Sequence, residues 1–276
     1  MKFKHPIITI NELTEVLNNP RLVILDCSID KIGKKLDELE VELIPNSLHF
    51  DIENQFSDLK SDLPHTLINE AKFSKEVQLL GINNDSIIVC YDRWGTYSSP
   101  RAWWMFKTMG FENVYVLNGG IKAWKKKNNL ISKTYKTIES IGNFEAKINL
   151  KWIVYTSDVL KATENSNKKI IDARSSLRFN AQVEEPRHGL RKGHIKNSVN
   201  IPFEEILADD YIKNENELQI IFKDYSNYEE TIFSCGSGIT ASILAIANHQ
   251  INPNQASKVY DGSWSEWGKD HELPIE

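Results

Sequence analysis

The loop segment Cys235-Gly236-Ser237-Gly238-Ile239-Thr240-Ala241 contains residue types suited to nucleophilic chemistry. It follows the short apolar run 231–234 and precedes a run with helical character, 241–247. A cysteine between a strand and a helix N-terminus lies where peptide N–H groups and the helix dipole converge, and that field favours the thiolate. The two glycines leave the loop backbone open to a substrate. The segment therefore predicts that Cys235 is a nucleophile, although a buried cysteine before an ordinary glycine-rich turn is the plainer alternative.

Length and composition limit the class of protein. With 276 residues the chain is long enough for two ordinary domains, each with its own core. Its 41% hydrophobic and 26% charged residues are typical of a soluble globular protein. The net charge of −5 argues against a nucleic-acid partner.

The termini and the cysteines bear on the cellular compartment. The N-terminal apolar stretch 7–10 is too short for a signal peptide, and no run approaches the length of a membrane span. Three cysteines, Cys27, Cys90 and Cys235, match neither a disulfide framework nor the close spacing of a zinc site. We therefore expect a cytoplasmic protein with no membrane partner and with no metal or organic cofactor. Cys27 and Cys90 lie in apolar runs and are expected to be buried packing residues.

The chain repeats itself. Four landmarks recur in the same order: 22–26 with 169–172, 44–48 with 195–199, Asp92 with Cys235, and Gly119 with Gly262. Asp92 and Gly119 are 27 residues apart, and so are Cys235 and Gly262. The repeat predicts two copies of one domain, residues 1–140 and 150–276, with the charged and polar stretch 125–149 as a linker.

Each copy alternates short β-rich apolar runs with longer helical patterns, such as 68–80, 99–109 and 239–248. This alternation favours an α/β fold in which a mostly parallel sheet is flanked by helices. Ligands of such sheets bind at the carboxyl ends of the strands, where Asp92 and Cys235 are expected to lie.

With these features the chain resembles the tandem-domain rhodaneses, sulfurtransferases with a silent N-terminal domain and a catalytic C-terminal one. The resemblance covers nearly the whole chain, and Asp92 in place of the nucleophile fits a silent first domain. The most specific motifs, besides the cysteine loop, are Asp172-Ala173-Arg174, Arg178-Phe179-Asn180-Ala181, Glu185-Pro186-Arg187, Gly189-Leu190-Arg191 and Gly193-His194-Ile195. Together they are similar to the 3-mercaptopyruvate sulfurtransferase branch more than to the thiosulfate branch.

The loop interior also bears on the donor. It carries no formal charge, whereas the resembling thiosulfate enzymes place cations there to meet a small dianion. In 3-mercaptopyruvate a methylene and a ketone separate the sulfur from the carboxylate, which suits a neutral loop. The expected reaction moves sulfur from this donor to a thiol or cyanide through a Cys235 persulfide and releases pyruvate. Peptide N–H groups of the loop (Gly236, Gly238, Ile239, Thr240) are expected to hold the incoming sulfur.

Two arginines are the candidates for binding the donor. A guanidinium can bind a carboxylate or a ketone oxygen in fork geometry, and the resemblance assigns Arg178 and Arg187 to the substrate. Arg174 and Arg191 are expected instead to form ion pairs that hold the loop.

A proton relay is implied by the resemblance. Ser237 lies two residues after the nucleophile, and in the resembling enzymes a serine at this place is linked to a histidine and an acid from the N-terminal half. Here the histidine is His65, and the acid is either Asp51 or Glu53. Such a relay could deliver a proton to the leaving enolate, whereas a histidine that only caps or packs its own loop is the alternative.

Three other functions are alternatives to 3-mercaptopyruvate sulfur transfer. A cysteine phosphatase is disfavoured, because position 241 is alanine where such enzymes need an arginine and the loop is one residue short. A thiosulfate:cyanide sulfurtransferase is the nearer alternative, and a persulfide carrier or interaction module without turnover is the non-enzymatic one. The acceptor is expected to be a thiol, on a thioredoxin-like protein or a small molecule.

Overall fold

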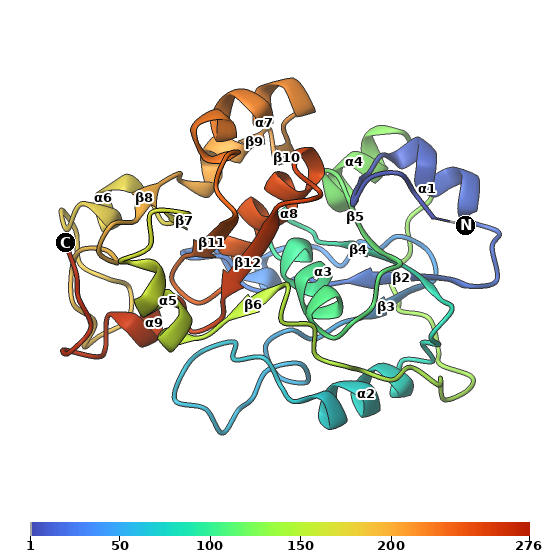
Figure 1. The fold of residues 1–276 in the computed structure, drawn as a ribbon. Coiled ribbons are helices and arrows are strands. Elements are labelled where there is room, and N and C mark those ends of the chain that lie inside the picture. Colours follow the sequence, from blue (N-terminus) through green and yellow to red (C-terminus); the bar gives the residue numbers. More distant parts are fainter. Residues whose placement is uncertain (1) are drawn as a thin grey trace. The chain divides into compact units, whose positions relative to one another are not determined.

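The computed structural model describes residues 2–276, which form two compact units. The first unit comprises the chain up to Asp58 together with Leu67–Asn149, and the second comprises Leu59–Thr66 together with Leu150–Glu276. Each unit contains one five-stranded sheet (Figure 1). Within residues 2–276, no helix is both long and apolar enough to cross a membrane.

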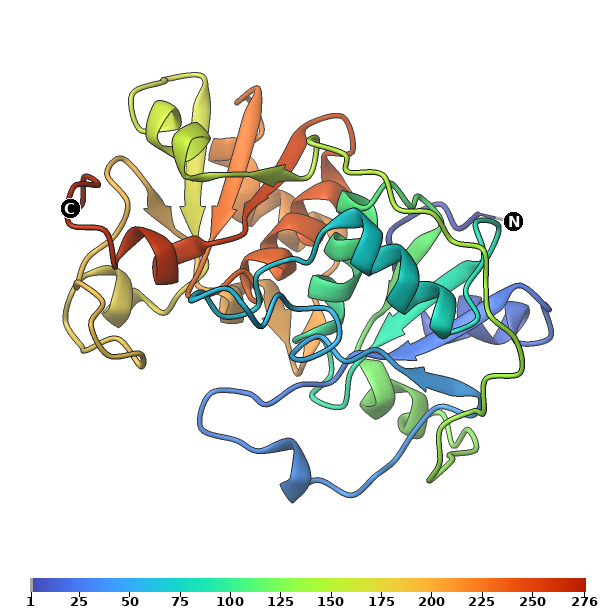
Figure 2. The ribbon, with the colours of Figure 1, turned by 90° about the horizontal axis from the view of Figure 1, so that it is seen from below.

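The first unit is a parallel sheet with the strand order β1-β5-β4-β2-β3. Its strands are β1 (Ile7–Ile8), β2 (Leu22–Asp26), β3 (Ser47–His49), β4 (Ile87–Tyr91) and β5 (Val114–Leu117). Its helices are α1 (Ile10–Val16), α2 (Glu70–Leu79), α3 (Ser99–Thr108) and α4 (Gly120–Lys126), with the 3₁₀ turn η1 (Leu36–Glu38). Helices α1 and α4 cover one face of the sheet, and α2 and α3 cover the other (Figures 1 and 2).

The second unit repeats this order with β6-β12-β11-β7-β8, again parallel. Its strands are β6 (Ile153–Val154), β7 (Lys168–Asp172), β8 (Val199–Asn200), β11 (Glu230–Ser234) and β12 (Ala256–Tyr260). Its helices are α5 (Thr156–Ala162), α6 (Ser176–Phe179), α7 (Glu215–Phe222), α8 (Ala241–Ile251) and α9 (Ser263–Trp267), with η2 (Phe203–Ile206) and η3 (Lys223–Tyr225). A hairpin of β9 (Leu207–Ala208) and β10 (Tyr211–Ile212) precedes α7.

The two sheets correspond strand for strand, which confirms the repeat and the α/β class. The central strands β4 and β11 are buried along their whole length, as expected of a parallel sheet covered on both faces. The predicted helices 68–80, 99–109 and 239–248 are α2, α3 and α8, with ends that differ by a few residues. All ten residues of α3 are buried, so its cluster of aromatic residues belongs to the core.

The stretch 125–149 belongs to the first unit by its contacts. The peptide N–H of Gly142 donates to the carbonyl of Gln78 (2.8 Å), and that of Phe144 donates to Ile82 (3.2 Å). The Phe144 ring is buried and lies 5.9 Å from the ring of Phe73. One aromatic residue in a polar stretch thus ties the expected linker to a core, because burying its ring removes a large apolar area from water.

Candidate active site

Cys235 follows the central strand β11 directly and is separated from helix α8 by five residues. This is the strand–cysteine–helix order that the sequence predicts. The residue before it, Ser234, is paired with Asp172 at the end of the neighbouring strand β7. Cys235 is only 2% exposed, so its thiol is buried and not on the open surface.

Three residues at the start of α9 hold the cysteine loop. The Cys235 N–H donates to Oγ of Ser263 (3.2 Å), and the Cys235 carbonyl accepts from the N–H of Trp264 (2.9 Å). Ser265 donates to the Gly236 carbonyl from both its N–H (3.0 Å) and its hydroxyl (2.6 Å). Four hydrogen bonds therefore fix the backbone on either side of the sulfur.

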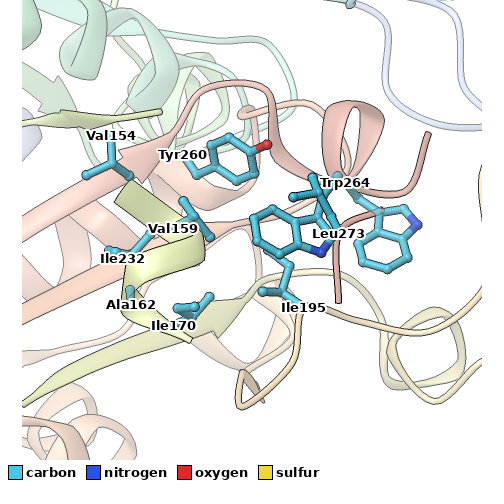
Figure 3. Close-up of a cluster of buried hydrophobic side chains, with 10 residues drawn as sticks. Val154, Val159, Ala162, Ile170, Ile195, Ile232, Tyr260, Trp264 and Leu273 are labelled. Atoms are coloured by element: carbon cyan, nitrogen blue, oxygen red, sulfur yellow. The ribbon is translucent and has the colours of Figure 1, made fainter. Parts of the chain in front are cut away.

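Trp264 is itself anchored in a core cluster of the second unit. The cluster lies beneath α5 and α9 (Figure 3) and comprises Val154, Val159, Ala162, Ile170, Ile195, Ile232, Tyr260, Trp264, Trp267 and Leu273. The Trp264 ring is fully buried, and its indole N–H donates to the Arg191 carbonyl (3.0 Å). Because the ring cannot move without opening the cluster, the peptide that holds Cys235 is rigid.

The cysteine loop leads directly into the N-terminus of α8, which is 11 residues long. The first N–H groups of a helix have no acceptor within the helix and carry the positive end of its dipole. Gly238 has a φ of +78°, a left-handed conformation that glycine adopts without steric cost. Ile239 is buried and Thr240 is half-buried.

Both candidate arginines lie at this loop. A Cβ atom placed on Gly236 would be 3.1 Å from Nη2 of Arg178 and 3.7 Å from Nη1 of Arg187. Arg178 comes from α6 and its side chain is 14% exposed, whereas Arg187 is an exposed residue of the following loop. The absence of a side chain at Gly236 thus leaves room for two guanidinium groups beside the cysteine.

Glu185 links Arg178 to Arg174, a role that the sequence analysis did not predict. Its carboxylate accepts from Nη2 of Arg178 (2.5 Å) and from Nη1 of Arg174 (2.8 Å), and its side chain is 2% exposed. Its place in the sequence, between Arg178 and Arg187, is the only signal of this role, and its burial fits the rule that acidic residues are rarely buried unless paired.

Arg174 and Arg191 hold the surroundings in different ways. Arg174 forms the predicted ion pairs, with Asp172 (2.6 Å) and Glu185, and its guanidinium lies 4.3 Å from the Trp264 ring centroid. For Arg191 the expected ion pair is wrong. Its guanidinium donates instead to carbonyls at and beyond the end of α9, including those of Trp267 (2.9 Å) and Leu273 (3.0 Å), because the end of a short helix offers unpaired acceptors.

Ser237 is linked to the predicted histidine. Nδ1 of His65 lies 3.0 Å from Oγ of Ser237, within hydrogen-bonding distance. Ser237 is 7% exposed and His65 is half-buried. The histidine belongs to the second unit through the segment Leu59–Thr66, although its sequence position is in the first half of the chain.

The two candidate acids belong to the first unit. The Asp51 carboxylate is engaged in a local turn, where it accepts from the N–H of Glu53 (3.1 Å) and from the N–H of Asn54 (2.9 Å). Both candidate acids thus belong to one turn, which the Asp51 side chain stabilises through its acceptors.

The loop after β4 in the first unit has an aspartate where the second has its cysteine. Asp92 is fully buried. Its carboxylate accepts from the peptide N–H groups of Trp94 (3.0 Å), Tyr97 (2.8 Å), Ser98 (3.0 Å) and Ser99 (2.9 Å), and from the Ser99 hydroxyl (2.7 Å). The start of this loop and of α3 is thus closed around a carboxylate.

The other two cysteines are fully buried, as predicted. Burial raises the pKa of the Cys27 thiol well above its usual value, and the neighbouring Cys90 adds to the shift. A buried thiol with a raised pKa is a poor nucleophile. Among residues 2–276, histidine, cysteine and acidic side chains form no group of three or more that could hold a metal ion.

Comparison with known proteins agrees with this architecture. The family model for the rhodanese-like domain matches residues 9–127 and again 156–270. The chain is 38% identical over 271 residues to a 3-mercaptopyruvate sulfurtransferase of Escherichia coli strain K12, covering 96% of this chain and 95% of that protein. It is 35% identical over 299 residues to the mitochondrial thiosulfate/3-mercaptopyruvate sulfurtransferase 1 of Arabidopsis thaliana, covering 98% of this chain and 78% of that protein.

A solved structure gives the same answer for the fold. The crystal structure of SseA from Escherichia coli superposes with a TM-score of 0.83 at 34% identity, covering 95% of this chain and 99% of that one. The chain therefore belongs to the rhodanese family, with two copies of the domain, and is a sulfurtransferase.

Proposed function

We propose that the protein transfers sulfur from 3-mercaptopyruvate to a thiol or cyanide through a persulfide on Cys235. The observation that carries the proposal is the pair of guanidinium groups beside an uncharged cysteine loop, with Arg178 and Arg187 both within 4 Å of the place of a Cβ on Gly236. This arrangement suits a donor whose anionic group is separated from its sulfur.

The first half-reaction makes the persulfide. The Cys235 thiolate attacks the donor sulfur, an S–S bond forms, and the C–S bond breaks. The electron pair of the broken bond leaves on the carbon fragment as the enolate of pyruvate. Peptide N–H groups from Gly236 to Thr240 stabilise the negative charge on the sulfur, as an oxyanion hole does for oxygen.

The arginines bind the carbon fragment. One guanidinium binds the carboxylate in fork geometry, and the other neutralises the charge that develops on the ketone oxygen. The buried Glu185 holds Arg178 in place by the 2.5 Å ion pair, so this cation needs little reorganisation during the reaction.

The leaving enolate then needs one proton. Ser237 is suited to pass it, since its hydroxyl lies 3.0 Å from Nδ1 of His65 and two residues from the nucleophile. We propose Glu53 or Asp51 as the acid that orients the histidine. The Asp51 carboxylate also accepts from peptide N–H groups of its own turn, so separate Asp51→Asn and Glu53→Gln variants distinguish the two.

The second half-reaction discharges the persulfide. A thiolate of the acceptor attacks the outer sulfur, the S–S bond breaks, and the Cys235 thiolate is restored. The acceptor is a small thiol or a thioredoxin-like protein. The first domain, which we place at residues 1–140, takes no part as a nucleophile, because Asp92 stands at the position that Cys235 has in the domain 150–276.

Thiosulfate is the second candidate donor, and one observation favours testing it: the Arabidopsis relative has both donors in its name. The deciding experiment measures kcat/KM for each donor with cyanide as the common acceptor, together with pyruvate release and persulfide formation. We expect a strong preference for 3-mercaptopyruvate, and loss of all turnover in Cys235→Ser with the fold retained. A preference for thiosulfate would overturn the donor assignment, and no turnover with either would favour a persulfide carrier.

A further inference from the structure

We propose that Glu185 is a specificity-determining residue: its charge sets the donor site to accept a monocarboxylate in preference to a dianion. The inference rests on the proposed function and deepens it, since it names the residue that separates the two candidate donors. A chain of ion pairs runs from Asp172 through Arg174 and Glu185 to Arg178, which lies at the cysteine loop.

One nitrogen of Arg178 lies close to both Glu185 and the cysteine loop. Nη2 of Arg178 is 2.5 Å from Oε2 of Glu185, and the same nitrogen is 3.1 Å from the place of a Cβ on Gly236. The Nε of Arg178 also donates to Glu185 (3.2 Å). The carboxylate is therefore close enough to the donor's binding place to offset part of the field of this arginine.

Two of the arginines beside the loop are already paired with acids. Arg174 pairs with Asp172 and Glu185, and Arg178 pairs with Glu185, while the loop interior has no formal charge. A donor with one carboxylate brings one negative charge to the place beside Arg178 and Arg187. A dianion such as thiosulfate brings a second negative charge to a place where Glu185 already lies, and like charges in a partly desolvated site repel strongly.

Glu185 is not needed to keep Arg174 in place. Arg174 is held independently by both carboxylate oxygens of Asp172 (2.9 Å and 3.1 Å from Nε), by the Gly193 carbonyl (2.8 Å) and by the Trp264 ring. Removing the charge of Glu185 while keeping its shape therefore changes the field at Arg178 more than it changes the packing.

The test compares three variants for both donors, with cyanide as the common acceptor. Glu185→Gln removes the charge, and Glu185→Asp keeps it on a shorter side chain. Glu184→Gln is the matched control, because it removes one charge from the adjacent residue. That side chain is 80% exposed and pairs with Lys192 away from the loop (2.5 Å).

We expect Glu185→Gln to raise the ratio of kcat/KM for thiosulfate to that for 3-mercaptopyruvate about tenfold, the effect of one uncompensated charge in a partly screened site. The shift should shrink as salt is added, because screening weakens charge–charge terms. Glu185→Asp and Glu184→Gln should keep the wild-type ratio.

Equal losses for both donors in Glu185→Gln would overturn the proposal and leave Glu185 a purely structural residue. An equal shift in Glu184→Gln would overturn it too, because the effect would then be one of net charge. Failure of the proposed function itself is distinguishable, since the wild-type protein would then not turn over 3-mercaptopyruvate.

Discussion

The loops after β4 and β11 share a backbone hydrogen bond but differ in the side chain at their first position. In both, the residue directly after the strand accepts at its carbonyl from an N–H of the second helix that follows. Asp92 accepts from Ile121 (3.2 Å), and Cys235 accepts from Trp264 (2.9 Å). In the first loop the side chain of Asp92 takes four peptide N–H groups for itself. In the second, the short and apolar thiol cannot do so.

The difference indicates that a loop with the proposed catalytic role has less stabilisation of its backbone N–H groups. A carboxylate attached to the chain satisfies the start of a helix permanently, and hydrogen bonds to charged groups are the stronger ones. A loop that must receive an anionic sulfur keeps its donors for the reaction and forgoes that stabilisation, an instance of the trade-off between stability and activity. We propose that the loop around Asp92, called the silent loop below, is stable and inert, and that the loop around Cys235, called the reactive loop, is less stable by itself.

Transplanting the nucleophile is the most severe test of this contrast. In the double variant Asp92→Cys with Cys235→Ser, we expect sulfur transfer to stay more than about 1,000-fold below wild type, since binding groups as well as a thiol are needed. Arg93 stands at the place of Gly236 and is paired with Asp26 (3.2 Å). Recovery of turnover, measured as pyruvate release, would show that the cysteine alone separates the loops.

The residue two places after the nucleophile also differs. It is Ser237 in the reactive loop, whereas the silent loop has Trp94, whose indole N–H donates to the Ile29 carbonyl (2.7 Å). Ser237→Ala should lower kcat with 3-mercaptopyruvate about 100-fold, the usual worth of a proton donor. His65→Ala should cost as much, and the double variant no more than either alone. Additive losses would mean that the two side chains do not act as a unit.

Stability should respond in the opposite direction to activity. Asp92→Ala leaves buried N–H groups without their acceptor, so the free energy of unfolding should fall by about 2 kcal/mol, with kcat/KM unchanged where the protein is folded. Cys235→Ala should cost less than about 1 kcal/mol while abolishing turnover. Urea titrations followed by tryptophan fluorescence measure both. Equal losses of stability would contradict the idea that the silent loop is held by its own carboxylate.

The smallest expected effect concerns the glycine beside the arginines. A methyl group in Gly236→Ala would meet Nη2 of Arg178 at 3.1 Å, so this guanidinium must shift by a few tenths of an ångström. We expect KM for the donor to rise about threefold with little change in kcat, as for lost uniform binding. Arg93→Ala, at the same place in the silent loop, is the control and should leave KM unchanged.

Local pattern was enough to predict much of this structure. The apolar runs, their spacing and the repeated landmarks predict the parallel sheets, the order of the elements and the place of Cys235 after a central strand. These features depend on periodicity and turn residues, which a single sequence displays. Arg178 and Arg187 were predicted from the family resemblance together with guanidinium chemistry, and both lie at the loop.

Pairing between distant residues could not be predicted in the same way. The fold of the loop 180–194 decides which acid pairs with Arg178. It also decides that Arg191 donates to carbonyls at and beyond the end of α9. Nothing in the composition of 125–149 reveals that Phe144 reaches a core. Long-range contacts of single side chains have no periodic signature. The sequence therefore shows which residues could pair and does not show which of them do.

The segment Leu59–Thr66 has a consequence for the first copy of the domain. It is encoded in the first copy, yet its contacts belong to the second unit, and it carries the histidine bonded to Ser237. A truncated protein consisting of residues 150–276 would retain Cys235 and both donor arginines and would lose that histidine. The first copy is therefore expected to be indispensable for the relay through His65, even though its own loop has Asp92 in place of a cysteine.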